Sequence, residues 1–363
     1  MRVQFQEADA FEEEAASDGS ATPARKAPGD AENRLMVASL QSLAQEMDEI
    51  AREASSVLED PARILSAEPG AFARIAARTV PRWHFAMLND GERNSALVAA
   101  LKRRVPAGAS VLDIGSGSGL LAMAAVRAGA GRVYTCEANP LLAEIARQTI
   151  AAHGMSGTVT VLAKRSDALR VGVDLDRPVD VLVSEIVDCG LIGEGLLPAF
   201  RDARERLLAP GGVLIPSAAR LYGRLVRSEA VAALNQVGKA DEFDVSLMNA
   251  LATRGHFPVR LNTWPHAMVS ETVRLLDLDL RRDALEPGER AVSLTATGDG
   301  EAHALAVWFE LDLGGGMVLR NSPADSGSHW MQGVIPFAEP VPTKVGEPVS
   351  FRLRWSDTRL SIR

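Results

Sequence analysis

An apolar segment that runs directly into a glycine-rich loop is the feature that most constrains the fold of this chain. Residues 111–114 (VLDI) are followed by Gly-Ser-Gly-Ser-Gly at 115–119, and a helical pattern then begins. Glycines let the backbone turn sharply and approach a ligand closely, and the N-terminus of the next helix offers free N–H groups. The pattern predicts a strand, a ligand-binding turn and a helix, although such a loop also serves nicotinamide and flavin enzymes.

The same alternation of strand and helix patterns continues through residues 81–215. Short apolar segments recur between helical ones, which is typical of a doubly wound α/β domain with a parallel sheet. The predicted strands are residues 110–115, 132–137, 159–163, 180–185 and 212–216. From residue 216 to residue 363 period-two alternation dominates, and it predicts a mostly β domain, either a sandwich or a barrel.

The N-terminal part of the chain has a different texture. Residues 1–33 are acidic and then rich in Ser, Pro, Gly and Ala, with few apolar side chains, so we expect them to be disordered. Residues 34–80 show helical spacing and predict two or three helices, interrupted at Pro61 and at residues 69–70 (Pro-Gly).

Composition and charge argue against several classes of protein and site. The formal net charge of −8 argues against a general nucleic-acid binder. The chain has no apolar run long enough to cross a membrane, and its N-terminus lacks the pattern of a secretory signal, so we expect a cytoplasmic protein. Two cysteines, Cys136 and Cys189, and histidines without HxxxH or HExxH spacing predict no metal site.

Three features bear on the cofactor. The loop is Gly-x-Gly-x-Gly after Asp113, whereas the dinucleotide fingerprint is Gly-x-Gly-x-x-Gly. Glu137 ends the second predicted strand, where its carboxylate can accept both ribose hydroxyls, although this also suits a nicotinamide cofactor. Residues 207–214 (LLAPGGVL) resemble the L-x-P-G-G turn late in class I methyltransferases. This resemblance implies a Rossmann-like domain that binds S-adenosyl-L-methionine.

The methyltransferase resemblance also implies a set of cofactor-binding residues. In it, Asp113 and the loop glycines line the methionine part of the cofactor, and Glu137 holds the ribose. Ser166 and Asp167 follow the third predicted strand and are expected near the adenine, although Asp167 fits a solvated loop equally well. The implied residues are Asp113, Gly115, Ser116, Gly117, Glu137, Ala138, Ser166 and Asp167.

Two glutamates follow the fourth predicted strand. Glu185 ends that strand, where ligands bind in sheets of this kind, and Glu194 closes a glycine-bearing loop that can fold back toward it. Two carboxylates that face one pocket repel each other unless a cation lies between them. A guanidinium is planar, permanently charged and carries five donors, so two glutamates can hold it. Taken alone, the two residues fit ordinary surface acids about as well.

Three motifs together resemble the protein arginine methyltransferase family. Residues 184–195 are similar to the family's double-E loop, residues 87–93 to its M-L-x-D-x-x-R stretch, and residues 328–330 (SHW) to its T-H-W loop. All three lie in the family's order, and the likeness covers about residues 80–363.

The family resemblance implies a role for each matching residue. Glu185 and Glu194 hold the substrate guanidinium, and Arg93 contacts the carboxylate of the cofactor and pairs with Glu185. Met87 packs beside the reacting methyl group, and His329 pairs with Asp90 across the two domains. The implied catalytic residues are Glu185, Glu194, His329, Asp90 and Met87, with Arg93 and Glu185 also placed at the cofactor. The implied reaction is methyl transfer from S-adenosylmethionine to a guanidinium nitrogen of arginine in a protein.

The family's catalytic modules usually pair through a helical arm early in the β domain. Residues 226–250 lie at that place and show a helical pattern. The resemblance therefore implies a homodimer, and a mostly β, barrel-like domain with a helical dimerisation arm after the Rossmann-like domain. The chain departs from the family in lacking a tyrosine-rich helix before Met87. Either Trp83 and Phe85 replace that helix over the cofactor, or the lid differs.

Three other functions stay open at this point. An enzyme of the same fold can act on a small molecule or on another acceptor, and a binding module can keep the fold without turnover. The presence of Asp113, Glu137, Arg93 and both loop glutamates argues against these two. A nicotinamide-dependent oxidoreductase is disfavoured by the glycine spacing and the double-glutamate loop. The expected partners are an arginine-containing protein and a second copy of the chain, without nucleic acid or membrane.

Overall fold

The computed structural model describes residues 30–59, 71–325 and 327–363. The chain divides into two compact units, residues 1–67 and 68–363. The described part of the first unit is helix α1 (Asp30–Glu59), which begins slightly before the predicted helical region. The disorder expected for residues 1–33 is wrong for residues 30–33, which belong to α1. Residues 1–29 and the breaks expected at Pro61 and residues 69–70 lie outside the described residues.

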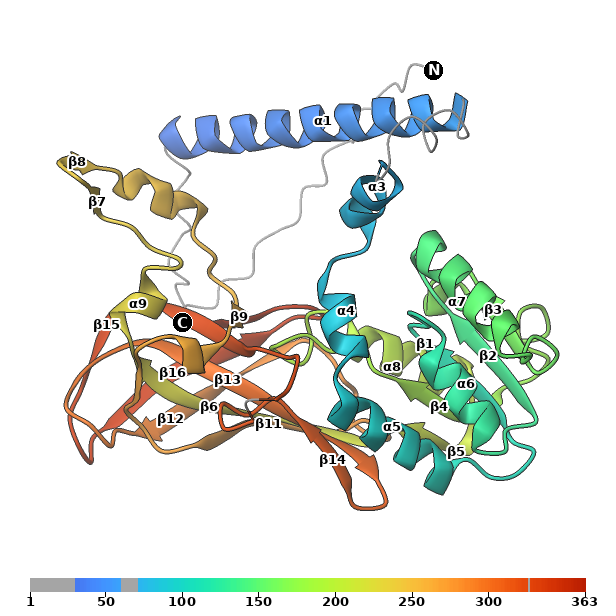
Figure 1. Cartoon of the computed structure of the whole chain (residues 1–363). Helices are drawn as coiled ribbons and strands as arrows, with labels where there is room; N and C mark the ends of the chain where they lie inside the picture. The colour runs from blue at the N-terminus through green and yellow to red at the C-terminus, as the bar shows by residue number, and fades with distance from the viewer. Residues whose placement is uncertain (1–29, 60–70, 326) are drawn as a thin grey trace, which may run out of the picture. The chain divides into compact units, whose positions relative to one another are not determined.

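The second unit begins with helices and a parallel sheet (Figure 1). The helices of this part are α3 (Ala71–Thr79), α4 (Trp83–Leu88), α5 (Gly91–Arg104), α6 (Leu120–Arg127), α7 (Pro140–Ala152) and α8 (Leu196–Arg206), with the 3-10 turn η1 (Ser166–Ala168). The strands are β1 (Ser110–Ile114), β2 (Arg132–Cys136), β3 (Val159–Leu162), β4 (Val179–Ser184) and β5 (Leu208–Ile215). All five predicted strands are present, which confirms the doubly wound α/β domain.

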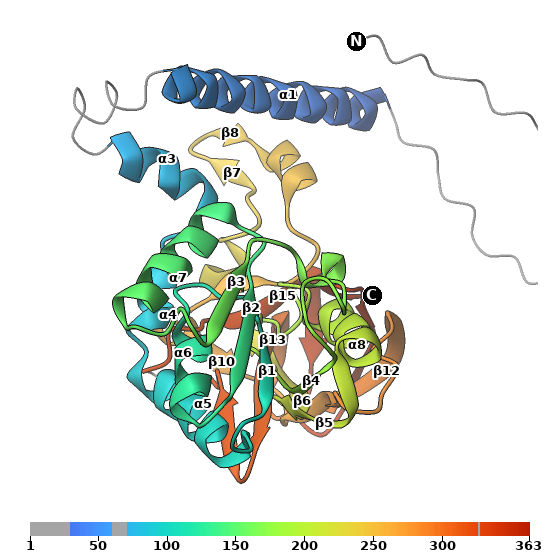
Figure 2. The same ribbon diagram turned by 90° about the vertical axis from the view of Figure 1, so that its right-hand side faces the viewer.

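The parallel sheet has the strand order β3-β2-β1-β4-β5. The chain therefore runs outward from β1 to one edge and then returns to the other side of β1 with β4. Figure 2 shows α5, α6 and α7 on one face of this sheet and α8 on the other. A crevice opens between the carboxyl ends of the two strands at which the direction reverses. This topology places the glycine loop after β1 beside the glutamate loop after β4.

The C-terminal part of the second unit is antiparallel. One sheet has the order β10-β6-β13-β15-β9, with β11 and β14 attached, and a second sheet has the order β12-β16-β17. The strands are β6 (Ala218–Arg227), β9 (Phe257–Val259), β10 (Ala267–Met268), β11 (Val273–Asp279), β12 (Gly288–Thr295), β13 (Gly300–Gly314), β14 (Met317–Arg320), β15 (Gln332–Thr343), β16 (Pro348–Trp355) and β17 (Leu360–Ile362). The pairings among the described strands do not close into a full barrel, so the predicted barrel-like form holds in a loose sense.

The predicted helical arm at residues 226–250 contains little helix. Only α9 (Glu229–Ala232) is α-helical there; the short strands β7 (Lys239–Ala240) and β8 (Phe243–Asp244) and the 3-10 turn η2 (Ser246–Leu251) follow. Asp241 has a φ of 56° in the turn between β7 and β8. The Asn249 side chain pairs with both the N–H and the carbonyl of Val237. These bonds join residues 12 apart in sequence and close the segment around the β7–β8 hairpin, a contact that the apolar spacing does not reveal.

One continuous apolar core joins the parallel sheet and the antiparallel sheets, and it includes fully buried side chains such as Leu182, Phe200 and Phe309. The two domains of the second unit are therefore held together by packing as well as by polar contacts. Among the described residues, no helix is both long enough and apolar enough to span a membrane.

Helix α7 offers a matched test of this core. Ile150 is 1% exposed and Ile145 is 40% exposed. We expect Ile150→Ala to lower the free energy of unfolding by about 2–5 kcal/mol, because it removes buried methyl groups and leaves a cavity. Ile145→Ala makes the same chemical change at the surface and should cost about 1 kcal/mol or less. Urea denaturation followed by circular dichroism measures both values, and equal losses would contradict the packing described here.

Candidate active site

A cavity of about 1140 Å³ lies at the crevice of the parallel sheet. Most of the residues predicted for the site line it: Met87, Gly115, Gly117, Glu137, Ala138, Ser166, Asp167, Glu185, Glu194 and His329. The other four, Asp90, Arg93, Asp113 and Ser116, do not line the cavity but are buried. The structure thus brings the ten lining residues together at one cavity, and the four buried residues lie behind that lining.

The glycine loop after β1 has the close-approach geometry expected of it. Gly115 has a φ of +88°, and a Cβ atom built there would lie 2.8 Å from Ile186 Cγ2. Its N–H donates to the carbonyl of Cys136 at 2.9 Å, which ties the loop to the end of β2. A side chain at this position would meet both backbone strain and a clash. The loop therefore leaves its backbone open to a ligand.

Glu137 is anchored by the backbone around it. One carboxylate oxygen accepts the Gly117 N–H at 3.0 Å, and the other accepts the Asn139 N–H at 2.9 Å. Each oxygen has a second lone pair, and the residue lines the cavity. This carboxylate is therefore held in place while it can still accept a hydroxyl from a bound ligand.

Asp113 is a fully buried carboxylate at the end of β1. Its Oδ2 accepts the Thr135 hydroxyl at 2.8 Å, whereas its Oδ1 lacks a hydrogen-bond partner among the described residues. Burial, with the nearby charge of Glu137, raises the pKa of Asp113 to about 7. A cationic ligand in the cavity favours the ionised form of this acid. The glycine cradle, the anchored Glu137 and this uncompensated oxygen fit a positively charged nucleoside cofactor.

Asp90 joins the start of α5 to the loop that carries His329. It is the N-cap of α5, where its Oδ1 accepts the Arg93 N–H at 2.9 Å. Its Oδ2 accepts the backbone N–H of His329 at 2.9 Å and pairs with His329 Nδ1 at 2.9 Å. Burial alone would raise the pKa of Asp90, but these hydrogen bonds lower it below its ordinary value.

The ionised Asp90 determines the protonation of His329. A carboxylate only accepts hydrogen bonds, so Nδ1 of His329 carries the proton and Nε2 is left as an acceptor. Burial lowers the pKa of His329 below its ordinary value, an effect larger than the opposing hydrogen bond to Asp90. The ring is therefore neutral near pH 7, the residue lines the cavity, and Nε2 has no hydrogen-bond partner among the described residues. The predicted pairing of His329 with Asp90 is present in the geometry.

Arg93 and Glu185 form a buried ion pair. Nε of Arg93 donates to Glu185 Oε2 at 2.7 Å, and Nη2 contacts the same oxygen. The two side chains are 5% and 3% exposed. Burial lowers the pKa of Arg93 to about 10, so the guanidinium stays charged at neutral pH. Because Arg93 bonds to Oε2, the second oxygen of Glu185 remains for a ligand.

Glu194 has a different environment from Glu185. It lines the cavity and is accessible to solvent there. Desolvation by the surrounding protein and the negative charge of Asp188 together raise the pKa of Glu194 to about 7, and Arg93 opposes both effects. No direct cation partner of Glu194 is present among the described residues. A cation that enters the cavity would therefore supply the missing countercharge.

Of the two aromatic residues expected to cover the cofactor, Trp83 and Phe85, one lies at the cavity and the other lies away from it. Trp83 lines the cavity and stacks on His84, with ring centroids 3.9 Å apart. Phe85 does not line the cavity and is 69% exposed. Only Trp83 is placed to contribute to a cover in this structure.

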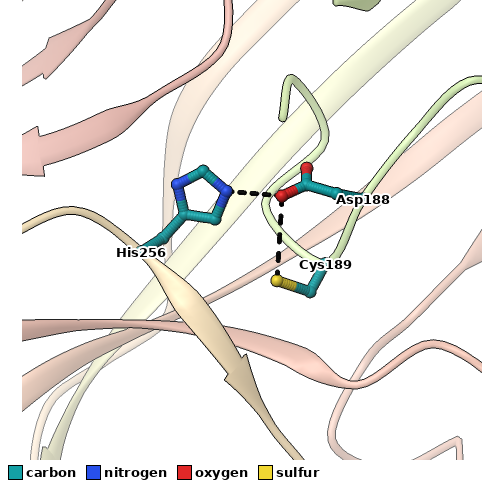
Figure 3. Close-up of side chains that lie close together, drawn as sticks. All are labelled: Asp188, Cys189 and His256. Carbon is teal, nitrogen blue, oxygen red and sulfur yellow. Dashed lines mark hydrogen bonds and ion pairs between the residues drawn. The ribbon is translucent and has the colours of Figure 1, made fainter. Parts of the chain in front are cut away.

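Sequence reasoning missed Asp188 and His256, which lie close together with Cys189 (Figure 3). His256 Nε2 is 2.5 Å from Asp188 Oδ2, and the Cys189 thiol points to the same oxygen at 3.9 Å. The position of Asp188 in the sequence between the two predicted glutamates is the signal that could have identified it as a site residue. His256 lies in a separate domain, and no local motif marks it.

Asp, Cys and His side chains commonly bind metals, and Asp188, Cys189 and His256 lie close enough together to do so. Their protonation, however, does not suit metal binding. The N–H of Leu360 donates to His256 Nδ1 at 3.1 Å. Nδ1 is therefore unprotonated, so Nε2 carries the proton and donates to Asp188, and it has no lone pair for a metal. Burial also raises the pKa of the Cys189 thiol, which disfavours the thiolate that a metal needs. The cluster is better described as a hydrogen-bonded pair with a neighbouring thiol.

The glycine cradle can be tested by cofactor binding. We expect Gly115→Ala to weaken binding of S-adenosylmethionine by roughly tenfold or more, because the new methyl group strains the backbone and displaces Ile186. Gly157→Ala is the control, since it has open space around it and an ordinary φ. Isothermal titration calorimetry gives both affinities, and wild-type affinity in Gly115→Ala would argue against this loop as the cofactor site.

Two protein-family models match the chain. Residues 217–363 match the arginine methyltransferase oligomerization subdomain, and residues 95–218 match the ribosomal protein L11 methyltransferase family. Among solved structures, the chain is similar to the Trypanosoma brucei PRMT1 enzyme-prozyme heterotetrameric complex with AdoHcy. That match has a TM-score of 0.68 at 22% identity and covers 79% of this chain and 93% of the other. Arabidopsis thaliana protein arginine methyltransferase 10 matches with a TM-score of 0.62 at 21% identity, over 77% of this chain and 89% of that one.

Curated relatives match at higher identity. An arginine N(omega)-methyltransferase from Streptomyces achromogenes subsp. streptozoticus is 65% identical over 329 residues, which are 91% of each chain. Protein arginine N-methyltransferase 7 from Oryza sativa subsp. indica is 32% identical over 319 residues, which cover 76% of this chain and 44% of the rice protein. The chain thus spans less than half of the rice relative but nearly all of the bacterial one. With the fold and the three sequence motifs in agreement, the chain belongs to the protein arginine methyltransferase family.

Proposed function

We propose that this chain transfers a methyl group from S-adenosylmethionine to an ω-nitrogen of an arginine guanidinium. The observation that carries the proposal is the pair of glutamates at the cavity. Within the described residues, Glu185 has one oxygen held by Arg93 and the other without a partner, and Glu194 lacks a direct cation partner. A guanidinium is a fixed cation with donors on two sides, and it satisfies both carboxylates at once.

The cofactor is expected beside this pair, with Asp113, Gly115, Gly117 and Glu137 holding it. When bound, the cofactor supplies a methyl group attached to a positively charged sulfur. The sulfur departs as a neutral thioether, so the leaving group needs little assistance from an acid. The work of the protein is therefore mainly to position the nucleophile in line with the methyl group. Met87, which lines the cavity, is proposed to limit how closely the acceptor approaches.

The glutamates also prepare the acceptor electronically. A protonated guanidinium is a poor nucleophile, and carboxylates bonded to some of its nitrogens localise the lone pair on the remaining one. Methylation forms one N–C bond, and the same nitrogen loses one proton. His329 and Glu194 are the two proposed proton acceptors, because both line the cavity and each has its basic form available near pH 7: a neutral imidazole for His329 and, with a pKa of about 7, an ionised carboxylate for Glu194.

The pH dependence follows from Glu194. Its carboxylate must be ionised to hold a guanidinium, and its pKa is raised to about 7. We therefore expect kcat/KM to rise as the pH increases through about 7, with the protonated enzyme inactive below that value. Glu194→Gln should lose this acid limb together with most of the activity. A pH–rate profile of both proteins checks this, and a limb near pH 4.5 would contradict the environment assigned to Glu194.

The function itself is tested with labelled S-adenosylmethionine and an arginine-rich peptide beside its lysine-substituted twin. We expect label on the arginine peptide alone. Glu185→Gln should abolish turnover while it leaves cofactor affinity within a few-fold, because the lost carboxylate contacts the acceptor. Glu301→Gln, an exposed residue on β13, is the matched control and should behave as wild type. Unchanged turnover in Glu185→Gln would remove Glu185 from the proposed site.

The same assay should include free L-arginine as a second candidate acceptor. The 65% identical relative is named for arginine, whereas the rice relative is named for protein arginine. Arginine within a protein is the first candidate from the sequence motifs, and free arginine is favoured by the name of that bacterial relative. Because both present the same guanidinium, Glu185 and Glu194 act alike on either. Relative kcat/KM for the peptide and for the free amino acid decides between the two acceptors.

We also propose that the chain forms a homodimer through residues 226–250. The matched family model over residues 217–363 is described as an oligomerization subdomain. The segment and its continuation expose large apolar side chains, including Phe243 at 70% and Leu247 at 72%. Exposed apolar clusters of this kind mark protein interfaces.

The dimer is tested by light scattering at micromolar concentration. We expect twice the mass of the 38.7 kDa chain for the wild type. The double variant Phe243→Asp, Leu247→Asp should have the mass of one chain, because two charges cannot be buried unpaired in an apolar interface. A single-chain mass for the wild type would count against the homodimer.

A further inference from the structure

The loop between Glu185 and Glu194 is organised around one acid, Asp188. Its Oδ1 accepts the Gly190 N–H at 3.1 Å and the Gly193 N–H at 2.8 Å. Gly193 directly precedes Glu194, so this bond fixes the backbone from which the Glu194 side chain extends. The placement of Glu194 therefore depends on where the Asp188 carboxylate is held.

His256 holds that carboxylate from the β domain. Its Nε2–H donates to Asp188 Oδ2 at 2.5 Å, and its side chain is 6% exposed (Figure 3). The ring is itself fixed by the C-terminal strand β17, because the Leu360 N–H donates to Nδ1 at 3.1 Å. The backbone N–H of His256 donates in turn to the Leu360 carbonyl at 3.1 Å. Backbone contacts thus set both the tautomer and the position of His256.

The two glycines of the loop allow this arrangement at close range. A Cβ atom at Gly190 would overlap the His256 ring, and one at Gly193 would overlap the Asp188 carboxylate. Neither glycine has a positive φ. Their lack of a side chain is required by the proximity of the histidine–aspartate pair, not by a special backbone conformation.

We propose that His256 is a positioning residue that acts through Asp188 to hold Glu194 toward the acceptor guanidinium. This role rests on the proposed function. It makes His256–Asp188 a second histidine–aspartate pair, separate from His329–Asp90, which holds a different loop. A neutral imidazole with an ionised Asp188 leaves one negative charge beside Glu194, which adds to the attraction for a cationic acceptor.

Three variants test the positioning role by steady-state kinetics. His256→Leu keeps the bulk but removes the donor, and should lower kcat/KM for the acceptor roughly 10- to 100-fold, as expected when a reacting group moves by about 1 Å. His256→Gln has an amide N–H that can reach Asp188, and should recover to within about threefold of wild type. His266→Leu, at an exposed histidine, is the control. Cofactor affinity by calorimetry should stay within about twofold in all three, since no cofactor contact is assigned to either histidine.

Asp188→Asn supplies a readout that a purely structural role would not move. The groups that act on Glu194 are Asp188 and Cys189 on its own loop and Arg93 on α5, and Glu185 and His329 line the same cavity. Removing the negative charge of Asp188 lowers the pKa of Glu194, so the acid limb of kcat/KM should move to lower pH. Wild-type kinetics in His256→Leu, a Gln variant no better than Leu, or an unshifted limb in Asp188→Asn would each overturn the proposal.

Crystal structures of His256→Leu and His256→Gln separate this inference from the proposed function. We expect Glu194 to be displaced in the Leu variant and restored in the Gln variant, whatever acceptor the enzyme uses. An unmoved Glu194 in His256→Leu overturns the positioning role even if arginine is methylated. Absence of arginine methylation by the wild type would reject the proposed function alone, and the position of Glu194 would still decide the role of His256.

Discussion

Two ionised carboxylates that share one cavity repel each other, so the protein must hold them in place. Much of the geometry of the site follows from this repulsion. Like charges in a common site raise each other's pKa and push apart. The protein compensates Glu185 internally with Arg93, at the cost of burying both charges. Glu194 has no such direct partner in the part of the chain that the structure describes, and burial together with the charge of Asp188 raises its pKa to about 7. The charge of Glu185 is thereby balanced within the protein, whereas the charge of Glu194 is balanced only when a cationic ligand binds.

The loop that carries these glutamates belongs to the α/β domain but is held by the β domain. Trp330 Nε1 donates to the Val187 carbonyl at 3.2 Å, and Asn321 Nδ2 donates to the Cys189 carbonyl at 3.1 Å. His256 adds the bond to Asp188. Three consecutive residues of the loop are thus fixed from two segments of the β domain, the β14–β15 connection and the segment that carries His256. The proposed acceptor site therefore depends on both domains, whereas the proposed cofactor site is built from the parallel sheet and its loops.

The Asp90 carboxylate performs two structural tasks with one charge. It caps α5, and so orients Arg93 toward Glu185, and it also fixes the tautomer of His329. A capping acid at a helix N-terminus is ordinary local chemistry. Here the same acid links the helix to a loop 239 residues away in sequence. Changes at Asp90 are therefore expected to affect the ion pair and the histidine together.

The sequence alone determined the elements whose signals are local. Apolar strands and glycine turns predicted the five parallel strands, because neighbours in sequence carry that information. Short motifs supported the family resemblance, which implied ten residues that line the cavity and four buried ones beside it. Only the tertiary structure decided the rest. The segment at 226–250 has helical apolar spacing, yet Asn249 bonds the backbone of Val237 and a hairpin forms instead. His256 has no motif, and Leu360 sets its tautomer from 104 residues away. Such contacts depend on how distant segments pack, and no pattern of neighbouring residues encodes that packing.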